Sequence, residues 1–243
     1  LGSARPGDGL VGDGHRHRAV IRDDGWDRHA VWEHSAALRD LYAARARGEA
    51  EEMTCAAQAA ELLTPRVRPG ETVLDAGCGS GHFWHSLSAR GIDAEYHGID
   101  ASRTLIGIGR AELPAHGLPA ERLQVMRIED LDGEADHVVC MNVISNLDNV
   151  YRPLERLLQV ARRTVVLRES LGEGSRYTYV TDEHLDGGAR LKVHVNRYDI
   201  GEVTDLIASH GFTPRVVVDR RTGGAPEMVI GHPHWWTFVV GER

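Results

Sequence analysis

Cysteine and long apolar runs are both scarce in this sequence. The three cysteines, Cys55, Cys78 and Cys140, are too few for a disulfide framework and lack the C-x-x-C spacing of a zinc site. No apolar run approaches the roughly 20 residues that span a bilayer. No positively charged segment followed by an apolar stretch opens the chain. We therefore expect a cytoplasmic protein with reduced thiols, and we expect no membrane as a partner.

Basic charge is also in short supply. Lysine and arginine together number 28 against 36 aspartates and glutamates, which gives a formal net charge of −8 and a pI of about 5.9. Lys192 is the only lysine among those 28. A chain with this balance has no overall electrostatic attraction to nucleic acid. We accordingly predict no nucleic-acid partner.

The length of 243 residues suits one α/β domain. Residues 1–25 are rich in Gly, Asp, His and Arg without apolar periodicity, and we predict a flexible tail there. Residues 26–243 are then a single domain. Apolar spacing predicts two helices at its start, one from Val31 to Gly48 and one from Met53 to Pro65.

From residue 71 onward, short apolar strands alternate with amphipathic helices. A capping box at Asp199–Glu202 opens the last helix, which Gly211 closes. This alternation predicts a mainly parallel sheet that helices cover on both faces. The predicted strands are 72–75, 94–100, 123–127, 135–141, 165–167, 215–219 and 235–240, and the predicted helices between them are 83–90, 102–113, 150–162 and 199–211.

A glycine-rich turn follows the first predicted strand directly, in the segment Asp75-Ala-Gly77-Cys78-Gly79-Ser-Gly81. Glycines allow a sharp turn and the close approach of a ligand, and free amides at a helix start favour electron-rich groups. In the dinucleotide-binding motif G-x-G-x-x-G the third glycine would fall at His82, so this motif is absent. No Lys-Ser/Thr pair follows, which also excludes a phosphate-binding P-loop. The motif therefore indicates a ligand site of another class.

The second predicted strand ends in Gly98-Ile-Asp100. A carboxylate at this edge suits the two hydroxyls of a ribose, although an aspartate there could also simply cap the next helix. Together with the glycine turn, Asp100 favours a nucleoside-containing ligand.

At this point the chain resembles the class I S-adenosylmethionine-dependent methyltransferases. The resemblance is carried by Val73–Gly81, Gly98–Asp100, Asp136–Val139 and the step Gly211-Phe212, and it covers roughly residues 30–240. It implies a Rossmann-like α/β fold with a seven-stranded, mainly parallel sheet in the order 3-2-1-4-5-7-6. The last strand is then antiparallel, helices cover both faces, and further helices precede the sheet. It also implies S-adenosyl-L-methionine as the cofactor.

The same resemblance implies roles for individual residues. Asp75 and the turn would hold the methionine end, Asp100 the ribose, and Ile128 to Asp130 the adenine. Many relatives have an aspartate where this chain has Arg127, which leaves the contact with the adenine amino group to Glu129, Asp130 or backbone. Tyr42 and Arg47 resemble residues that reach the cofactor carboxylate, although they could also be a core and a surface residue. The predicted cofactor-binding set is Tyr42, Arg47, Asp75, Gly77, Cys78, Gly79, Gly81, Asp100, Ala101, Ile128, Glu129, Asp130 and Met141.

The segment after the fourth strand bears on the acceptor. Met141–Asn146 lacks the Asn/Asp-Pro-Pro-Tyr run of amino-methylating DNA enzymes. With the acidic charge, this favours methylation of O or N on a small organic acceptor, such as a specialised metabolite or a sugar. A tRNA or protein methyltransferase and a non-catalytic S-adenosylmethionine-binding partner subunit remain alternatives. A homodimer also stays open.

Residues 170–197 interrupt the alternation and form a predicted insertion or lid on the substrate side. The segment contains His184 and His194, which we predict as proton acceptors. His194 is preferred because Val193 and Val195 flank it in an alternating pattern. His232 and His234 form an H-x-H pair, and Glu169 or His184 could complete a metal site with them. Because the sequence shows no second pair of ligands, we predict no bound metal.

Overall fold

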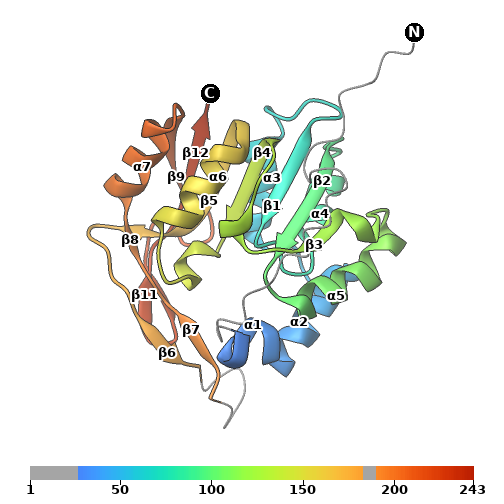
Figure 1. Ribbon diagram of the computed structural model, residues 1–243, viewed down its shortest axis with the longest axis horizontal. Helices are drawn as coiled ribbons and strands as arrows, with labels where there is room; N and C mark the ends of the chain where they lie inside the picture. Colours follow the sequence, from blue (N-terminus) through green and yellow to red (C-terminus); the bar gives the residue numbers. More distant parts are fainter. Residues whose placement is uncertain (1–26, 183–189) are drawn as a thin grey trace.

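The computed structural model describes residues 27–182 and 190–243, and a twisted sheet runs through its centre (Figure 1). The strand order is β3-β2-β1-β4-β5-β12-β9. All neighbours are parallel except that β12 is antiparallel to both β5 and β9. This confirms the predicted order 3-2-1-4-5-7-6 with an antiparallel last strand. The strands are β1 Thr72–Ala76, β2 Glu95–Asp100, β3 Leu123–Val125, β4 Ala135–Met141, β5 Ala161–Gly172, β9 Thr213–Val218 and β12 Trp236–Glu242.

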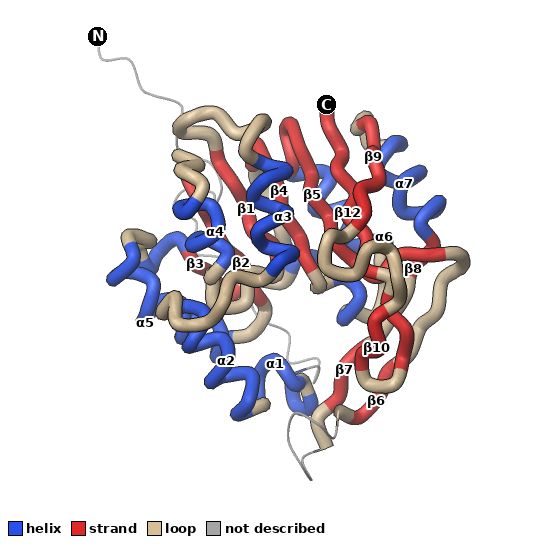
Figure 2. The backbone as a smooth tube through the Cα atoms, turned by 180° about the vertical axis from the view of Figure 1, so that it is seen from behind, coloured by secondary structure: helices blue, strands red, loops and turns tan. Residues whose placement is uncertain are grey.

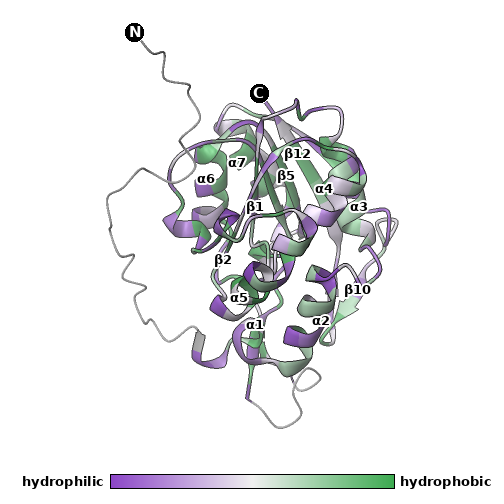
Figure 3. Ribbon diagram, turned by 90° about the vertical axis from the view of Figure 1, so that its right-hand side faces the viewer, coloured by the Kyte–Doolittle hydropathy of each residue, from purple (hydrophilic) through white to green (hydrophobic). Residues whose placement is uncertain are grey.

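Helices cover both faces of this sheet. In Figure 3 the mostly hydrophobic central strands lie between α6 and α7 on one side and α3 and α4 on the other. Each face has its own cluster of buried apolar side chains, and removal of that surface from water is the main driving force for the fold. The helices are α1 Val31–His34, α2 Ala36–Ala46, α3 Thr54–Leu63, α4 Phe83–Ala89, α5 Arg103–Glu112, α6 Tyr151–Val160 and α7 Ile200–Ser209.

Side-chain caps explain where several helices begin. Ser102 accepts a hydrogen bond from the Leu105 amide at the start of α5, and Asp199 accepts one from the Glu202 amide at the start of α7. The single helix predicted between Val31 and Gly48 is wrong. Ser35 has an extended backbone and caps α2, so the chain forms α1 and α2 separately.

Strand β5 is much longer than the predicted 165–167. It begins at Ala161, where α6 has just ended, and it continues to Gly172. The apolar run alone gave the prediction, but the polar residues that follow it are also buried. This extension carries Arg168 and Glu169 to the carboxyl edge of the sheet.

Two small hairpins, which the sequence analysis did not predict, lie beside this carboxyl edge (Figures 1 and 2). One pairs β6 Tyr179–Thr181 with β7 Lys192–His194, and the other pairs β10 Glu227–Val229 with β11 His232–His234. A two-residue strand, β8 Tyr198–Asp199, pairs with the end of β5. The first hairpin also contacts the N-terminal helices, because Val193 packs with Val31 and Leu38.

No helix within the described part of the chain is long and apolar enough to cross a membrane. The predicted tail at 1–25 and His184 lie outside the described residues.

Candidate active site

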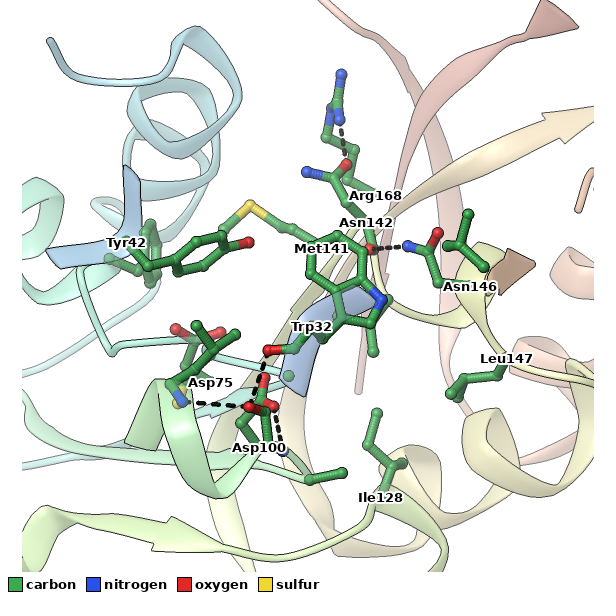
Figure 4. A pocket seen from close by; sticks show the side chains of 18 of the residues that line it. Trp32, Tyr42, Asp75, Asp100, Ile128, Met141, Asn142, Asn146, Leu147 and Arg168 are labelled. Carbon is green, nitrogen blue, oxygen red and sulfur yellow. Dashed lines mark hydrogen bonds between the residues drawn. The ribbon is translucent and has the colours of Figure 1, made fainter. Parts of the chain in front are cut away.

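A cavity of about 950 Å³ opens at the carboxyl edge of the sheet. The turn after β1 and helices α1 and α2 contribute lining residues, and so do the two hairpins. Figure 4 shows Tyr42 and Asp75 across the cavity from Asn146 and Leu147. Open parallel α/β sheets bind ligands at this edge. The cavity is lined by ten of the predicted site residues, namely Tyr42, Asp75, Gly77, Cys78, Asp100, Ala101, Ile128, Glu129, Met141 and His194.

Four predicted residues are not among those that line the cavity: Arg47, Gly79, Gly81 and Asp130. Arg47 lies just past the end of α2, where its guanidinium forms ion pairs with Glu49 at 2.8 Å and Glu112 at 3.6 Å. Arg45 lines the cavity instead, with its guanidinium carbon 5.1 Å from the centre of the Tyr42 ring.

The glycine turn has the conformation that its sequence predicts. The φ angles of Gly77, Gly79 and Gly81 are +80°, +58° and +75°, a region that residues with a Cβ rarely adopt. A Cβ on Gly77 would lie 2.2 Å from a methyl carbon of Val143, and one on Gly79 would lie 2.3 Å from the Tyr42 ring. Both the backbone and the packing therefore require glycine at these positions.

Two carboxylates lie at the ends of the adjacent strands β1 and β2. Asp75 is only 3% exposed and accepts a hydrogen bond of 2.7 Å from the Tyr96 hydroxyl. Asp100 accepts hydrogen bonds of 2.8 Å from the amides of Gly79 and Ser102, so it ties the turn to the start of α5. Burial raises the pKa of Asp75 to about 7 and that of Asp100 to about 6.

Aromatic rings form the wall on the side of the N-terminal helices. The rings of Trp32 and Tyr42 meet edge to face with centroids 6.5 Å apart, and Tyr42 meets His82 in the same way at 5.4 Å. Burial lowers the pKa of His82 to about 3, so this ring is neutral. Glu33 fixes α1 against α5, because its carboxylate accepts a hydrogen bond of 2.7 Å from the Ser102 hydroxyl.

The first hairpin contributes a second set of side chains. The His194 ring stacks on Tyr179 with centroids 4.4 Å apart, and the Lys192 ammonium lies 5.3 Å from the centre of the same Tyr179 ring. All three line the cavity. Burial lowers the pKa of His194, an effect that the nearby Asp148 carboxylate opposes. The sequence analysis predicted His194 but missed Tyr179 and Lys192, although alternation along the segment could have placed Lys192 and His194 on one face.

Arg168 on β5 is a further residue that the sequence analysis missed. Its side chain is 2% exposed, and it lines the cavity beside Asn142 (Figure 4). Its Nε donates to Asp219 at 2.7 Å, and its Nη1 donates to the Asn142 side chain. Its guanidinium carbon lies 4.6 Å from the centre of the Trp236 ring. The available signal was an arginine directly after a buried apolar strand.

Glu169 fixes the loop after β4. Its buried carboxylate accepts hydrogen bonds of 2.8–2.9 Å from the amides of Val143, Ile144 and Ser145. Burial raises its pKa. Because this loop carries Asn142, Glu169 determines the position of one cavity wall. Among the described residues, no group of three or more His, Cys, Asp or Glu side chains could hold a metal ion.

Comparison with known proteins identifies the class. Residues 74–167 match a family model described as a methyltransferase domain. Magnesium protoporphyrin IX methyltransferase from Synechocystis PCC 6803, with S-adenosylhomocysteine bound, has a similar structure with a TM-score of 0.55 and 16% identity, covering 78% of this chain and 82% of that chain. The 1,6-didemethyltoxoflavin-N1-methyltransferase of Burkholderia thailandensis, with 1,6-didemethyltoxoflavin and S-adenosylhomocysteine bound, has a TM-score of 0.52 and 17% identity, covering 86% of this chain and 88% of that chain.

The N-terminal domain of EvdMO1 with S-adenosylhomocysteine bound is also similar, with a TM-score of 0.55 and 18% identity over 77% of this chain and 80% of that chain. The sheet order and the family model together define a Rossmann-like methyltransferase. The chain thus contains a methyltransferase domain, and the solved structures whose fold it shares include methyltransferases with S-adenosylmethionine or S-adenosylhomocysteine bound.

Proposed function

We propose that this enzyme methylates a small organic acceptor, which binds beside the cofactor in the same cavity. The observation that carries the proposal is the extent of the cavity, which runs from the glycine turn to the two hairpins. Its volume of about 950 Å³ lies at the upper end of the range for small-molecule sites. The net charge of −8 favours a small acceptor over a nucleic acid.

The cofactor half of the cavity matches the chemistry of S-adenosylmethionine. The Asp75 carboxylate suits the ammonium group of the methionine moiety, and the Asp100 carboxylate suits the two ribose hydroxyls. Ile128 and Glu129 form a wall for the adenine ring, with Ala101, Cys78 and Met141 completing the contacts. Asp130 is exposed and does not line the cavity, so we give it no contact with the adenine.

The carboxylate of the cofactor needs a cation. Arg47 is held by two glutamates away from the cavity, whereas Arg45 lines it beside Tyr42. We therefore assign the contact with the cofactor carboxylate to Arg45 and Tyr42. In a cavity shielded from bulk water, such an ion pair is stronger than on the surface.

The acceptor half is formed by the first hairpin, the loop after β4 and the end of β5. The bound cofactor supplies an electrophilic methyl group, and the protein must align the acceptor with it and exclude water. We assign proton removal to His194, because its lowered pKa leaves the ring neutral near pH 7 and able to accept a proton. Stacking on Tyr179 fixes the direction of the ring.

Calorimetry and an activity screen test this proposal. S-adenosylhomocysteine should bind with a dissociation constant in the micromolar range, about −8 kcal/mol. Asp100→Ala should weaken that binding by about 1.5–3 kcal/mol, the value of hydrogen bonds to a charged group, whereas Asp132→Ala on the exposed surface should not. In the screen, a radioactive methyl group should appear on a small molecule and not on tRNA or protein. Methylated tRNA, with a steep loss of affinity on adding salt, would contradict the small-molecule assignment.

A further inference from the structure

One wall of the cavity contains a hydrogen-bond donor that the cofactor half does not use. Arg168 donates through Nε to Asp219 and through Nη1 to Asn142, but its Nη2 is buried and has no hydrogen-bond partner. A buried guanidinium nitrogen without an acceptor is costly and rare in native proteins. Since Arg168 also lines the cavity, a ligand can supply the missing acceptor.

The N-terminus of α3 also lines the cavity. Met53, Thr54 and Cys55 line the cavity at the first turn of this ten-residue helix. The N-cap residue Met53 has no side-chain hydrogen bond to that turn, so its first amides have no capping side chain. Helix α3 packs against β5, the strand that carries Arg168. The positive end of the helix dipole adds to the positive charge of the guanidinium.

Three further charged side chains in this region already have partners. Asp219 accepts from Arg168, and Glu52 pairs with Arg90 at 2.7 Å. Arg221, which also lines the cavity, pairs with Glu227. Glu51 lines the cavity as well and is exposed to solvent.

The Trp236 ring lies against the Arg168 guanidinium and restricts its orientation. Arg168 Nη2 and the first amides of α3 are therefore donors that a ligand can use.

We propose that the acceptor is an anion, and that its carboxylate or phenolate oxygen binds to Arg168 Nη2 and the N-terminus of α3. This inference rests on the proposed function and specifies the class of its substrate. A single free nitrogen can donate to one anionic oxygen, whereas a bidentate contact would need two free nitrogens. Arg168 is then a specificity-determining residue of the acceptor site.

The test compares matched charged and neutral probes by calorimetry. Protein saturated with S-adenosylhomocysteine is titrated at pH 7.5 with benzoate and 1-naphthoate, and separately with benzamide and 1-naphthamide. We expect each carboxylate to bind about tenfold or more tightly than its amide, since hydrogen bonds to charged groups exceed neutral ones. The paired variant Arg168→Gln with Asp219→Asn removes both charges of the buried ion pair, so no carboxylate is left buried alone. It should abolish this preference.

Two controls separate the site from general effects. Arg197 lies 4.8 Å from the centre of the Trp235 ring but does not line the cavity, so Arg197→Gln should keep the preference. Thr54→Pro removes one amide donor at a helix position that tolerates proline, whereas Thr54→Ala keeps the amide. The proline variant should bind carboxylates several-fold more weakly than the alanine variant.

The readouts distinguish the two proposals. If wild-type protein fails to bind S-adenosylhomocysteine, the proposed function fails. If it binds but carboxylates and amides have equal affinity, or neither binds, the anion site is overturned. A carboxylate preference that survives in the paired Arg168 and Asp219 variant also overturns it. Equal affinity of the two Thr54 variants overturns the part assigned to α3.

Discussion

The affinity for S-adenosylhomocysteine should depend on pH through Asp75. In the free protein, burial raises the pKa of Asp75 to about 7 and that of Asp100 to about 6. In the proposed complex both groups act as carboxylates, because Asp75 faces an ammonium group and Asp100 accepts from hydroxyls. Binding thus requires these protons to leave, so affinity should fall as the pH falls through the two pKa values.

The magnitude follows from the pKa values. At pH 5 Asp75 lies about two pH units below its pKa, and each unit corresponds to about 1.36 kcal/mol. Removal of its proton therefore costs about 2.7 kcal/mol, which is roughly a hundredfold in affinity relative to pH 8. Asp100 is more accessible to solvent than Asp75, and we expect a smaller contribution from it.

The stability of the free protein should change in the opposite direction. The folded-state pKa of each carboxyl lies above the ordinary value of 3.8. Each therefore contributes stability that is fully present below about pH 4 and is lost as the pH rises through 6 to 7. The increase in melting temperature on adding S-adenosylhomocysteine should consequently be larger at pH 8 than at pH 5.5.

Calorimetry at pH 5 to 8, in two buffers of different ionisation enthalpy, measures both the affinity and the protons released. Asp75→Asn should bind more weakly at pH 8 and show a flatter pH profile. The exposed Asp132 provides the matched control, and Asp132→Asn should keep the steep profile. An affinity that is constant from pH 5 to 8, with no proton release, would refute the reasoning about Asp75.

Three further substitutions test other parts of the structure. Gly77→Ala should abolish measurable cofactor binding and lower the unfolding free energy in urea titrations by about 1–3 kcal/mol. The reasons are the positive φ of Gly77 and the clash of a new Cβ with Val143. Unchanged binding would contradict the turn geometry. Glu169→Gln should lower the unfolding free energy by about 1–3 kcal/mol in the same assay, because a backbone amide of the loop after β4 loses its acceptor. The exposed Glu173→Gln should leave the unfolding free energy unchanged. Equal stability of the two variants would show that the Glu169 carboxylate does not hold the loop. His194→Ala should lower turnover by about 10²–10⁴ at saturating cofactor with unchanged cofactor affinity; near wild-type turnover would remove His194 from proton transfer.

The sheet order and the cofactor turn could be predicted because their signals are local. A strand followed at once by Gly77, Gly79 and Gly81 leaves few conformations other than the turn that the structure shows. The helix cap at Asp199 likewise depends on residues only three positions apart. The prediction at Ser35 was wrong because the apolar stripe continues through this residue, whereas its hydroxyl forms a cap that interrupts the helix.

The cation near Tyr42 illustrates a signal that the sequence contained. Arg45 lies three residues after Tyr42 and so shares its helix face, whereas Arg47 lies beyond the end of α2. Helical spacing therefore favours Arg45, which lines the cavity beside Tyr42.

The acceptor half could not be predicted in this way. The buried guanidinium of Arg168 is paired with Asp219, which lies 51 residues later in the chain and accepts from it. The stacking of Tyr179 on His194 depends on the register of a hairpin, which pairs two residues that are 15 positions apart in the chain. Partnerships of this kind arise from tertiary structure, so the residues around each position do not identify its partner.

A crystal structure with S-adenosylhomocysteine bound tests the central claim most directly. The account predicts the ribose hydroxyls within hydrogen-bond distance of Asp100 and the amino group near Asp75. It also predicts that the sulfur faces an open space between His194 and Arg168. Cofactor bound elsewhere, or a sulfur facing a wall with no room for an acceptor, would contradict the account.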